Sequence, residues 1–211
     1  NEKEARLFAG FQIDVEPYTK PDFNLRKGHY AGRYLKMVKE LKAAAGDDLP
    51  LSVVLPFWFD SVMLQDKPLS FHVMDVADEV VLMSYRTTFD ELVASGCDEL
   101  TYAGVIGKPL LLGIETVKLP RERHIIIARR EALKHLPADA GDIILTPDIR
   151  DRLPVDRQFF VRPEKITFFG KLDQVKAILA KQPPYEMFSG YVIHSFESYL
   201  QQGNGVFRTA P

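Results

Sequence analysis

Two carboxylates stand close together near the start of the chain. Asp14 and Glu16 come at the end of an apolar run, Leu7–Val15, and Pro17 follows directly. Residues two apart in an extended segment point to the same side, so both carboxyl groups are expected on one face. Like charges held this close raise each other's pKa, and one group can then keep a proton near neutral pH. The pair therefore predicts general acid–base chemistry.

A third acidic residue, Glu115, ends another apolar run and is the expected ionised partner of this pair. Glycoside hydrolysis needs such a division, with one protonated carboxyl for the leaving group and one carboxylate as nucleophile or base. Trp58 and Tyr85, also at the ends of apolar runs, would offer flat faces to sugar rings. These residues predict a hydrolase that acts on a polysaccharide, with catalytic Glu16, Asp14 and Glu115.

Further residues at the ends of apolar runs complete the expected substrate site. The predicted substrate-binding residues are Gln12, Trp58, Asp60, Tyr85, Arg86 and Glu197. Structural roles stay open for several of them: Asp60 can cap a helix, Trp58 can fill the core, and Glu197 can pair with Arg86. His194 stands in the same position of its run, where a hydrogen-bonded core histidine is the commoner outcome.

Five short apolar runs carry these residues, and helical patterns separate them. The runs are Leu7–Val15, Leu51–Phe59, Glu79–Tyr85, Pro109–Thr116 and Gly190–Phe196. Nearly continuous apolar runs are typical of parallel strands that are buried on both faces.

The predicted helices lie between these runs. The first has Tyr34 and Val38 on its apolar face and ends at Gly46. Others are expected at residues 69–77, at Leu172–Lys181, and from an N-cap at Thr88 through about Cys97.

Serial βα units predict either an open doubly wound sheet or a barrel. No strand is followed by a glycine-rich turn, which a dinucleotide-binding sheet needs, and barrels carry their chemistry at the carboxyl ends of strands. We therefore expect an α/β fold, a partial (β/α)8 TIM-type barrel in a single domain, residues 1–211. With Gly190–Phe196 as strand eight, Glu115 falls on strand seven and Glu16 on strand four, so about three βα units would precede Asn1. Residues 117–168 form a long insertion after the Glu115 strand. A second copy of the chain, as a homodimer, or this insertion would cover the open barrel edges.

Composition and charge argue against several classes of function. The chain has 211 residues and a formal net charge of −2, with no basic block for nucleic acid. Its apolar runs are too short for a membrane span. A single cysteine, Cys97, excludes an intrachain disulfide, and the missing His-x-His spacing argues against a metal. We expect no cofactor, and we expect an exported protein whose signal would lie upstream of Asn1.

Two short motifs resemble those of known glycosidases. Ala9–Glu16 resembles the D-G-x-D-x-D-x-E strand of chitinase-type glycoside hydrolases, and Leu82–Arg86 resembles their M-x-Y-D motif. The same strand is similar to the G-x-x-x-D-x-E-P strand of bacterial barrel proteins described as glycosidases. The resemblance implies that Glu16 is the proton donor, Asp14 its charge-tuning neighbour and Tyr85 a substrate-positioning group. Glu16 with Glu115 also resembles the glutamate pair of retaining glycosidases.

Three positions depart from the chitinase pattern. Ala9 and Gln12 replace its first two aspartates, and Arg86 stands where an aspartate is expected. These departures keep a second hypothesis open, a catalytically inactive barrel that binds a glycan or a protein partner.

Overall fold

The computed structural model describes residues 8–20, 22–127 and 155–203. The middle of the 117–168 insertion, residues 128–154, lies outside these residues.

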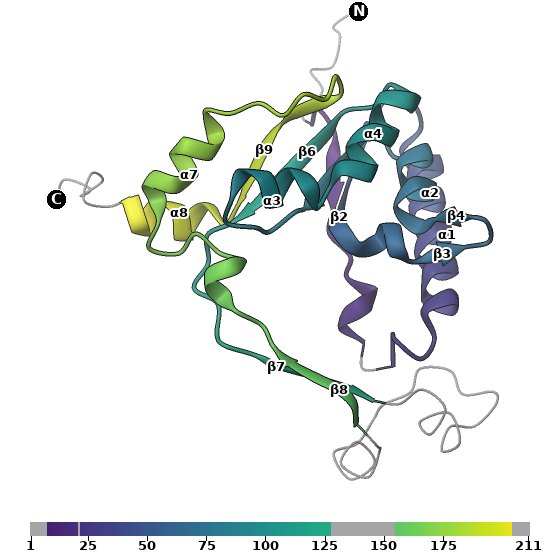
Figure 1. The fold of residues 1–211 in the computed structure, drawn as a ribbon. Helices are drawn as coiled ribbons and strands as arrows, with labels where there is room; N and C mark the ends of the chain where they lie inside the picture. Colours follow the sequence, from purple (N-terminus) through teal and green to yellow (C-terminus); the bar gives the residue numbers. More distant parts are fainter. Residues whose placement is uncertain (1–7, 21, 128–154, 204–211) are drawn as a thin grey trace, which may run out of the picture.

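The centre of the molecule is a five-stranded parallel sheet (Figure 1). Its strands are β1 (Phe11–Ile13), β2 (Leu51–Pro56), β5 (Glu79–Met83), β6 (Leu110–Glu115) and β9 (Phe188–His194). They pair in the order β1-β2-β5-β6-β9, which is their order in the chain. The α/β fold and the five predicted strands are confirmed.

Helices connect neighbouring strands. They are α1 (Lys27–Ala45), α2 (Leu69–Val76), α3 (Phe89–Ala94), α4 (Cys97–Ile106), α7 (Leu172–Leu179) and α8 (Phe196–Gly203). Three short 3-10 turns, η1 (Pro17–Thr19), η2 (Phe57–Ser61) and η3 (Pro163–Lys165), follow strand ends or precede helices. No helix in the described part of the chain is long and apolar enough to cross a membrane.

Local sequence explains where these helices begin and end. The predicted apolar face of α1 is buried, including Tyr34 and Val38. Gly46 ends α1 with φ +66°, a conformation that costs glycine little. Thr88 caps α3, because its hydroxyl accepts a hydrogen bond from the Glu91 amide at 3.3 Å.

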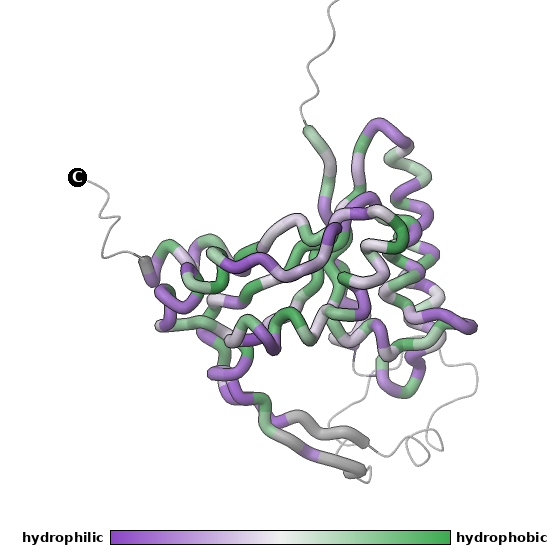
Figure 2. Tube along the Cα trace, turned by 45° about the horizontal axis from the view of Figure 1, so that its top comes forward, coloured by the Kyte–Doolittle hydropathy of each residue, from purple (hydrophilic) through white to green (hydrophobic). Residues whose placement is uncertain are grey.

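All the helices that contribute to the main core pack on one face of the sheet. That core joins α1, α2, α3, α4 and α7 to alternate strand residues such as Val53, Leu82 and Leu112. The intervening residues Val54, Val81 and Met83 form a separate cluster on the opposite face, where Tyr18 of η1 packs but no α-helix of the described part of the chain does. Because the strands follow one another in chain order and right-handed crossovers join them, the connecting helices all lie on the same face of the sheet. Figure 2 shows hydrophobic residues along the central strands and a mixture of hydrophilic and hydrophobic residues along the helices.

The described ends of the 117–168 insertion form a hairpin that returns to the sheet. Strands β7 (Arg123–Ile127) and β8 (Val155–Phe160) pair antiparallel and run away from the sheet in Figure 1. After β8 the chain comes back to the carboxyl end of β6, where Thr167 forms a parallel bridge with Glu115. The Phe168 amide donates to the Glu115 carbonyl at 2.8 Å. The insertion therefore begins and ends beside Glu115.

Candidate functional site

The best-defined polar contact at the carboxyl ends of the strands joins β6 to β9. Glu115 and His194 are register partners, and Glu115 Oε2 lies 2.9 Å from His194 Nδ1. The Val117 amide donates to the other oxygen, Oε1, at 2.6 Å. The Glu115 side chain is 5% exposed and that of His194 57%. Glu115 is therefore a buried carboxyl with both oxygens hydrogen-bonded and its orientation fixed.

A second carboxyl group lies beyond the end of β1. The Tyr18 hydroxyl donates a hydrogen bond to Glu16 Oε1, and Oε2 has no partner in the described part of the chain. Partial burial raises the pKa of Asp14, the negative charge of Glu16 adds to the rise, and His194 partly offsets it. Asp14 and Glu16 thus influence each other through their charges.

Tyr85 is in contact with His194 and lines the same hollow as Glu16. Burial is the main cause that raises the pKa of its hydroxyl, and the charges of Glu115, Asp14 and Glu16 add to the rise in that order. Its ring stacks on that of His194, with 6.2 Å between centroids and 22° between planes. Tyr85 thus stays a neutral hydroxyl that all three carboxylates influence.

A hollow of about 220 Å³ opens beside Glu16 and Tyr85. Its walls are formed by Glu16, Tyr18, Pro56, Phe57, Trp58, Met83, Tyr85, Arg86 and Ile166. Trp58 also packs edge-on against Tyr18, with centroids 5.3 Å apart, so it is both a core residue and a wall residue. The Arg86 guanidinium carbon lies 4.4 Å from the centroid of the Phe57 ring. The walls therefore combine aromatic faces with one acid and one cation.

Three predicted substrate-binding residues lie elsewhere. Asp60 is on η2 rather than at a strand end, and burial is the main cause that raises its pKa, with the charge of Asp98 of α4 adding to the rise. Gln12 faces away from the core of the sheet and donates to Ser52 Oγ at 3.0 Å. Glu197 lies in the first turn of α8 and makes no ion pair with Arg86 within the described ranges. Of the predicted residues, Glu16, Trp58, Tyr85 and Arg86 line one hollow. Glu115 is connected to it through His194, which stacks on Tyr85, and Asp14 acts on Tyr85 through its charge.

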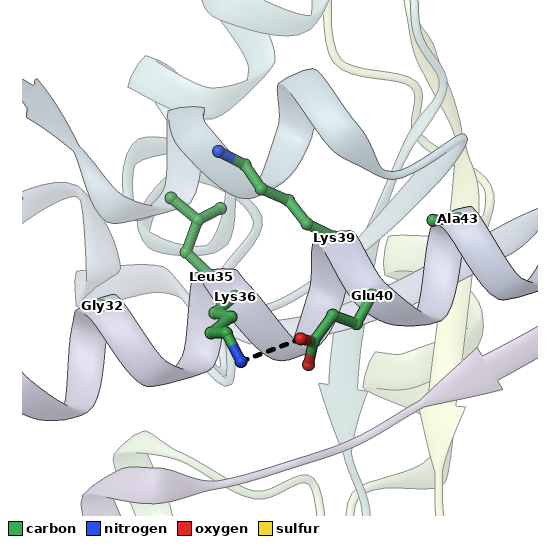
Figure 3. Close-up of a pocket in the computed structure, with 6 residues that line it drawn as sticks. All are labelled: Gly32, Leu35, Lys36, Lys39, Glu40 and Ala43. Carbon is green, nitrogen blue, oxygen red and sulfur yellow. Dashed lines mark ion pairs between the residues drawn. The ribbon is translucent and has the colours of Figure 1, made fainter.

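Another surface hollow lies on α1 and has a different character. Figure 3 shows it lined by Leu35, Lys36, Lys39 and Glu40, with Lys36 and Glu40 paired along the helix at 2.9 Å. An ion pair this exposed contributes little, about 0.5 kcal/mol. No strand end contributes to this hollow, so it is separate from the carboxylates at the carboxyl ends of the strands.

Two residues of the site were not predicted as part of it. Tyr18 follows the Glu16-Pro17 dipeptide, and η1 folds its hydroxyl back onto Glu16. His194 was expected in the core, yet it is exposed and bound to Glu115. A tyrosine two residues after a candidate catalytic glutamate is the signal that could have indicated the first of these contacts.

Within residues 8–127 and 155–203, Pro21 excepted, no three side chains of metal-binding type gather. No protein-family model matches the chain, and neither a curated protein nor a solved structure matches it.

Proposed function

We propose that the chain is a glycoside hydrolase-like protein that cleaves a polysaccharide by carboxylate acid–base catalysis. Glu16 is the acid–base residue, Asp14 is its charge-tuning neighbour, and Glu115 is the second carboxylate. The observation that carries the proposal is a short chain of contacts: Glu16 and Tyr85 line one aromatic-walled hollow, and Tyr85 stacks on His194, which lies within hydrogen-bond distance of Glu115.

The two glutamates are held in ways that suit two different roles. Both oxygens of Glu115 have a hydrogen-bond partner, the Val117 amide for Oε1 and His194 Nδ1 for Oε2, which favours a fixed orientation of the carboxyl group. Glu16 is an exposed residue, with one oxygen held by Tyr18 and the other without a hydrogen-bond partner among the described residues. A carboxyl with an open oxygen can pass a proton to a glycosidic oxygen, while the fixed carboxylate acts as nucleophile or base. Trp58 and Tyr85 supply the faces on which a sugar ring stacks.

The fold we propose is a partial (β/α)8 barrel with Val54, Val81 and Met83 facing its lumen. A doubly wound sheet reverses its strand order and has helices on both faces, whereas this sheet keeps chain order and has one helical face. In a barrel the carboxyl ends of the strands form the active face, and these ends carry Glu16, Tyr85 and Glu115. Further βα units, or a second copy of the chain, would pair with the edge strands β1 and β9.

The decisive experiment compares wild type with Glu16→Gln on a panel of neutral and acidic polysaccharides, with reducing-end release as the measurement. We expect the substitution to abolish release while the thermal midpoint changes little, because Glu16 is exposed. Glu40→Gln, which removes an equally exposed acid on α1, is the matched control and should keep full activity.

Full activity in Glu16→Gln would contradict the assignment. The second hypothesis, a barrel that binds glycan without cleaving it, predicts that wild type also releases no reducing ends yet retains binding. Arg86 would be expected to neutralise Glu16 in such a protein, and the two form no ion pair within the described ranges. That observation favours the hydrolase.

A further inference from the structure

Arg86 is the one cationic side chain in the wall of the hollow beside Glu16, within the described part of the chain. It follows Tyr85 directly after β5. Its guanidinium lies over the Phe57 ring, 4.4 Å from carbon to centroid, and Nη1 donates to the Tyr85 carbonyl at 2.8 Å. Stacking on an aromatic ring and one backbone hydrogen bond fix the plane of an arginine side chain. The guanidinium is therefore held ready at the wall of the hollow.

The charge of Arg86 has no acidic partner within the described residues. The charge of Arg86 contributes to the lowered pKa of Glu91, but Glu91 forms its ion pair with Lys165, at 3.6 Å. Four of the five guanidinium N–H groups thus remain available, since one donates to Tyr85. A guanidinium that faces a hollow without a carboxylate partner suits a bidentate anion such as a carboxylate or a sulfate.

More cations lie on the chain segments that lead away from the hollow. Lys118 lies 5.8 Å from the centroid of the Phe169 ring, and Arg121 lies 5.0 Å from that of Phe160. Phe160 is 55% exposed and Phe169 43%. These segments join the sheet beside Glu115 through the Thr167 bridge. Cations paired with exposed aromatic faces are suited to sugar rings that carry negative charge.

We propose that the substrate is an acidic glycan and that Arg86 binds the anionic group of the sugar unit in the hollow. Lys118 with Phe169, and Arg121 with Phe160, contact further units along the insertion. This inference rests on the proposed function, since it names the substrate class of the same site. The shared chemistry is a monoanionic oxygen group, either the carboxylate of a uronic acid or a sulfate ester.

The test measures binding by affinity electrophoresis, so that it does not depend on turnover. Polygalacturonate, alginate and hyaluronate are each compared with their carboxyl-reduced forms, and dextran sulfate is compared with dextran. We expect at least one charged polymer to bind about 10-fold or more tightly than its neutral counterpart, as for hydrogen bonds to charged groups. Tighter binding of a uronate polymer than of its carboxyl-reduced form identifies a uronic acid as the bound group. Tighter binding of dextran sulfate than of dextran identifies a sulfate ester.

Arg86→Met should remove this preference, and Arg86→Lys should keep only part of it, because an ammonium lacks the planar fork. Arg33→Met, on the exposed surface of α1, is the matched control and should retain the preference. Thermal midpoints establish that each variant is folded. If Arg86→Met fails to fold, Arg86→Lys and the charged-neutral pairs still decide the question.

Equal binding of charged and neutral polymers, or no binding to any of them, would overturn the inference. An unchanged preference in Arg86→Met would overturn the role of Arg86. These outcomes differ from failure of the proposed function. An acidic glycan that binds in an Arg86-dependent way without release of reducing ends would leave the inference standing and remove the hydrolase.

Discussion

Glu115 and His194 face each other at the ends of β6 and β9, with 2.9 Å between Oε2 and Nδ1, although 79 residues separate them in the chain. The contact follows from the parallel register, in which Glu115 pairs with His194. The same histidine stacks on Tyr85, two residues beyond the end of β5. One imidazole thus contacts both the buried carboxyl of Glu115 and the ring of Tyr85.

His194→Phe should keep the stacking on Tyr85 and remove the hydrogen bond to Glu115. We expect the rate of polysaccharide hydrolysis to fall about 10- to 100-fold, because a carboxylate that loses its orientation is misplaced for reaction. The thermal midpoint should change little, since the His194 side chain is 57% exposed. His194→Gln, which can still donate to Glu115, should recover part of the rate.

His29→Phe on α1 is the control for loss of an exposed imidazole, and it should keep full activity. Full activity in His194→Phe would show that Glu115 keeps its orientation without the hydrogen bond to His194.

Gly113 makes room for Tyr85. A Cβ atom at Gly113 would lie 3.1 Å from the Leu82 carbonyl oxygen and 3.1 Å from Cε1 of the Tyr85 ring. Gly113→Ala should therefore push the ring away from its place against His194, lowering both activity and stability, the latter by about 1–3 kcal/mol as in other overpacked sites.

Gly104→Ala is the matched control for that substitution. Gly104 lies in α4 with open space around its Cβ position. Alanine there should stabilise the protein by about 0.5–1 kcal/mol, because glycine weakens a helix interior, and should leave activity unchanged. Denaturant unfolding and reducing-end release measure the two effects. A Gly113→Ala variant that keeps both at the wild-type level would show that Tyr85 is free to move.

The order of strands and helices was predictable because burial and caps are local signals. The run Leu51–Phe59 contains β2, and Gly46 and Thr88 mark helix ends as expected. Boundaries were less accurate. Strand β2 stops at Pro56, since Phe57–Ser61 turns into η2 and takes Asp60 away from the sheet edge. The helix expected through Cys97 ends at Ala94, and a separate helix, α4, begins at Cys97.

The site was predictable only in its residue types. Strand ends could be found from apolar runs, so Glu16, Tyr85 and Glu115 were expected near one another. The contact of Glu115 with His194 depends on the register between β6 and β9, which includes a shift near Leu110. No local pattern encodes that register. The position of Arg86 over Phe57 likewise depends on η2, which replaced the expected end of a strand.

Glu99 of α4 is a buried carboxyl outside the candidate site. It is 0% exposed, and neither carboxyl oxygen has a hydrogen-bond partner in the described part of the chain. The Ser70 hydroxyl lies beside it without completing a hydrogen bond. Burial, followed by the charges of Asp60 and Asp98, raises the pKa of Glu99 to about 7. The folded protein therefore holds a proton on Glu99 that the unfolded chain releases at lower pH.

This difference predicts that stability falls as pH rises. Below pH 4.5, the ordinary value for the group, both states are protonated and Glu99 contributes no pH dependence. Between pH 4.5 and about 7 only the unfolded chain loses the proton, so the free energy of unfolding should decrease by roughly 1.4 kcal/mol per pH unit from this group. Glu99→Gln removes the titration, and its free energy of unfolding should lose that slope, whereas Glu40→Gln should keep it. Urea unfolding at pH 5, 6, 7 and 8 measures the slopes, and parallel curves for wild type and Glu99→Gln would show that Glu99 is ionised in the folded protein at every one of these pH values.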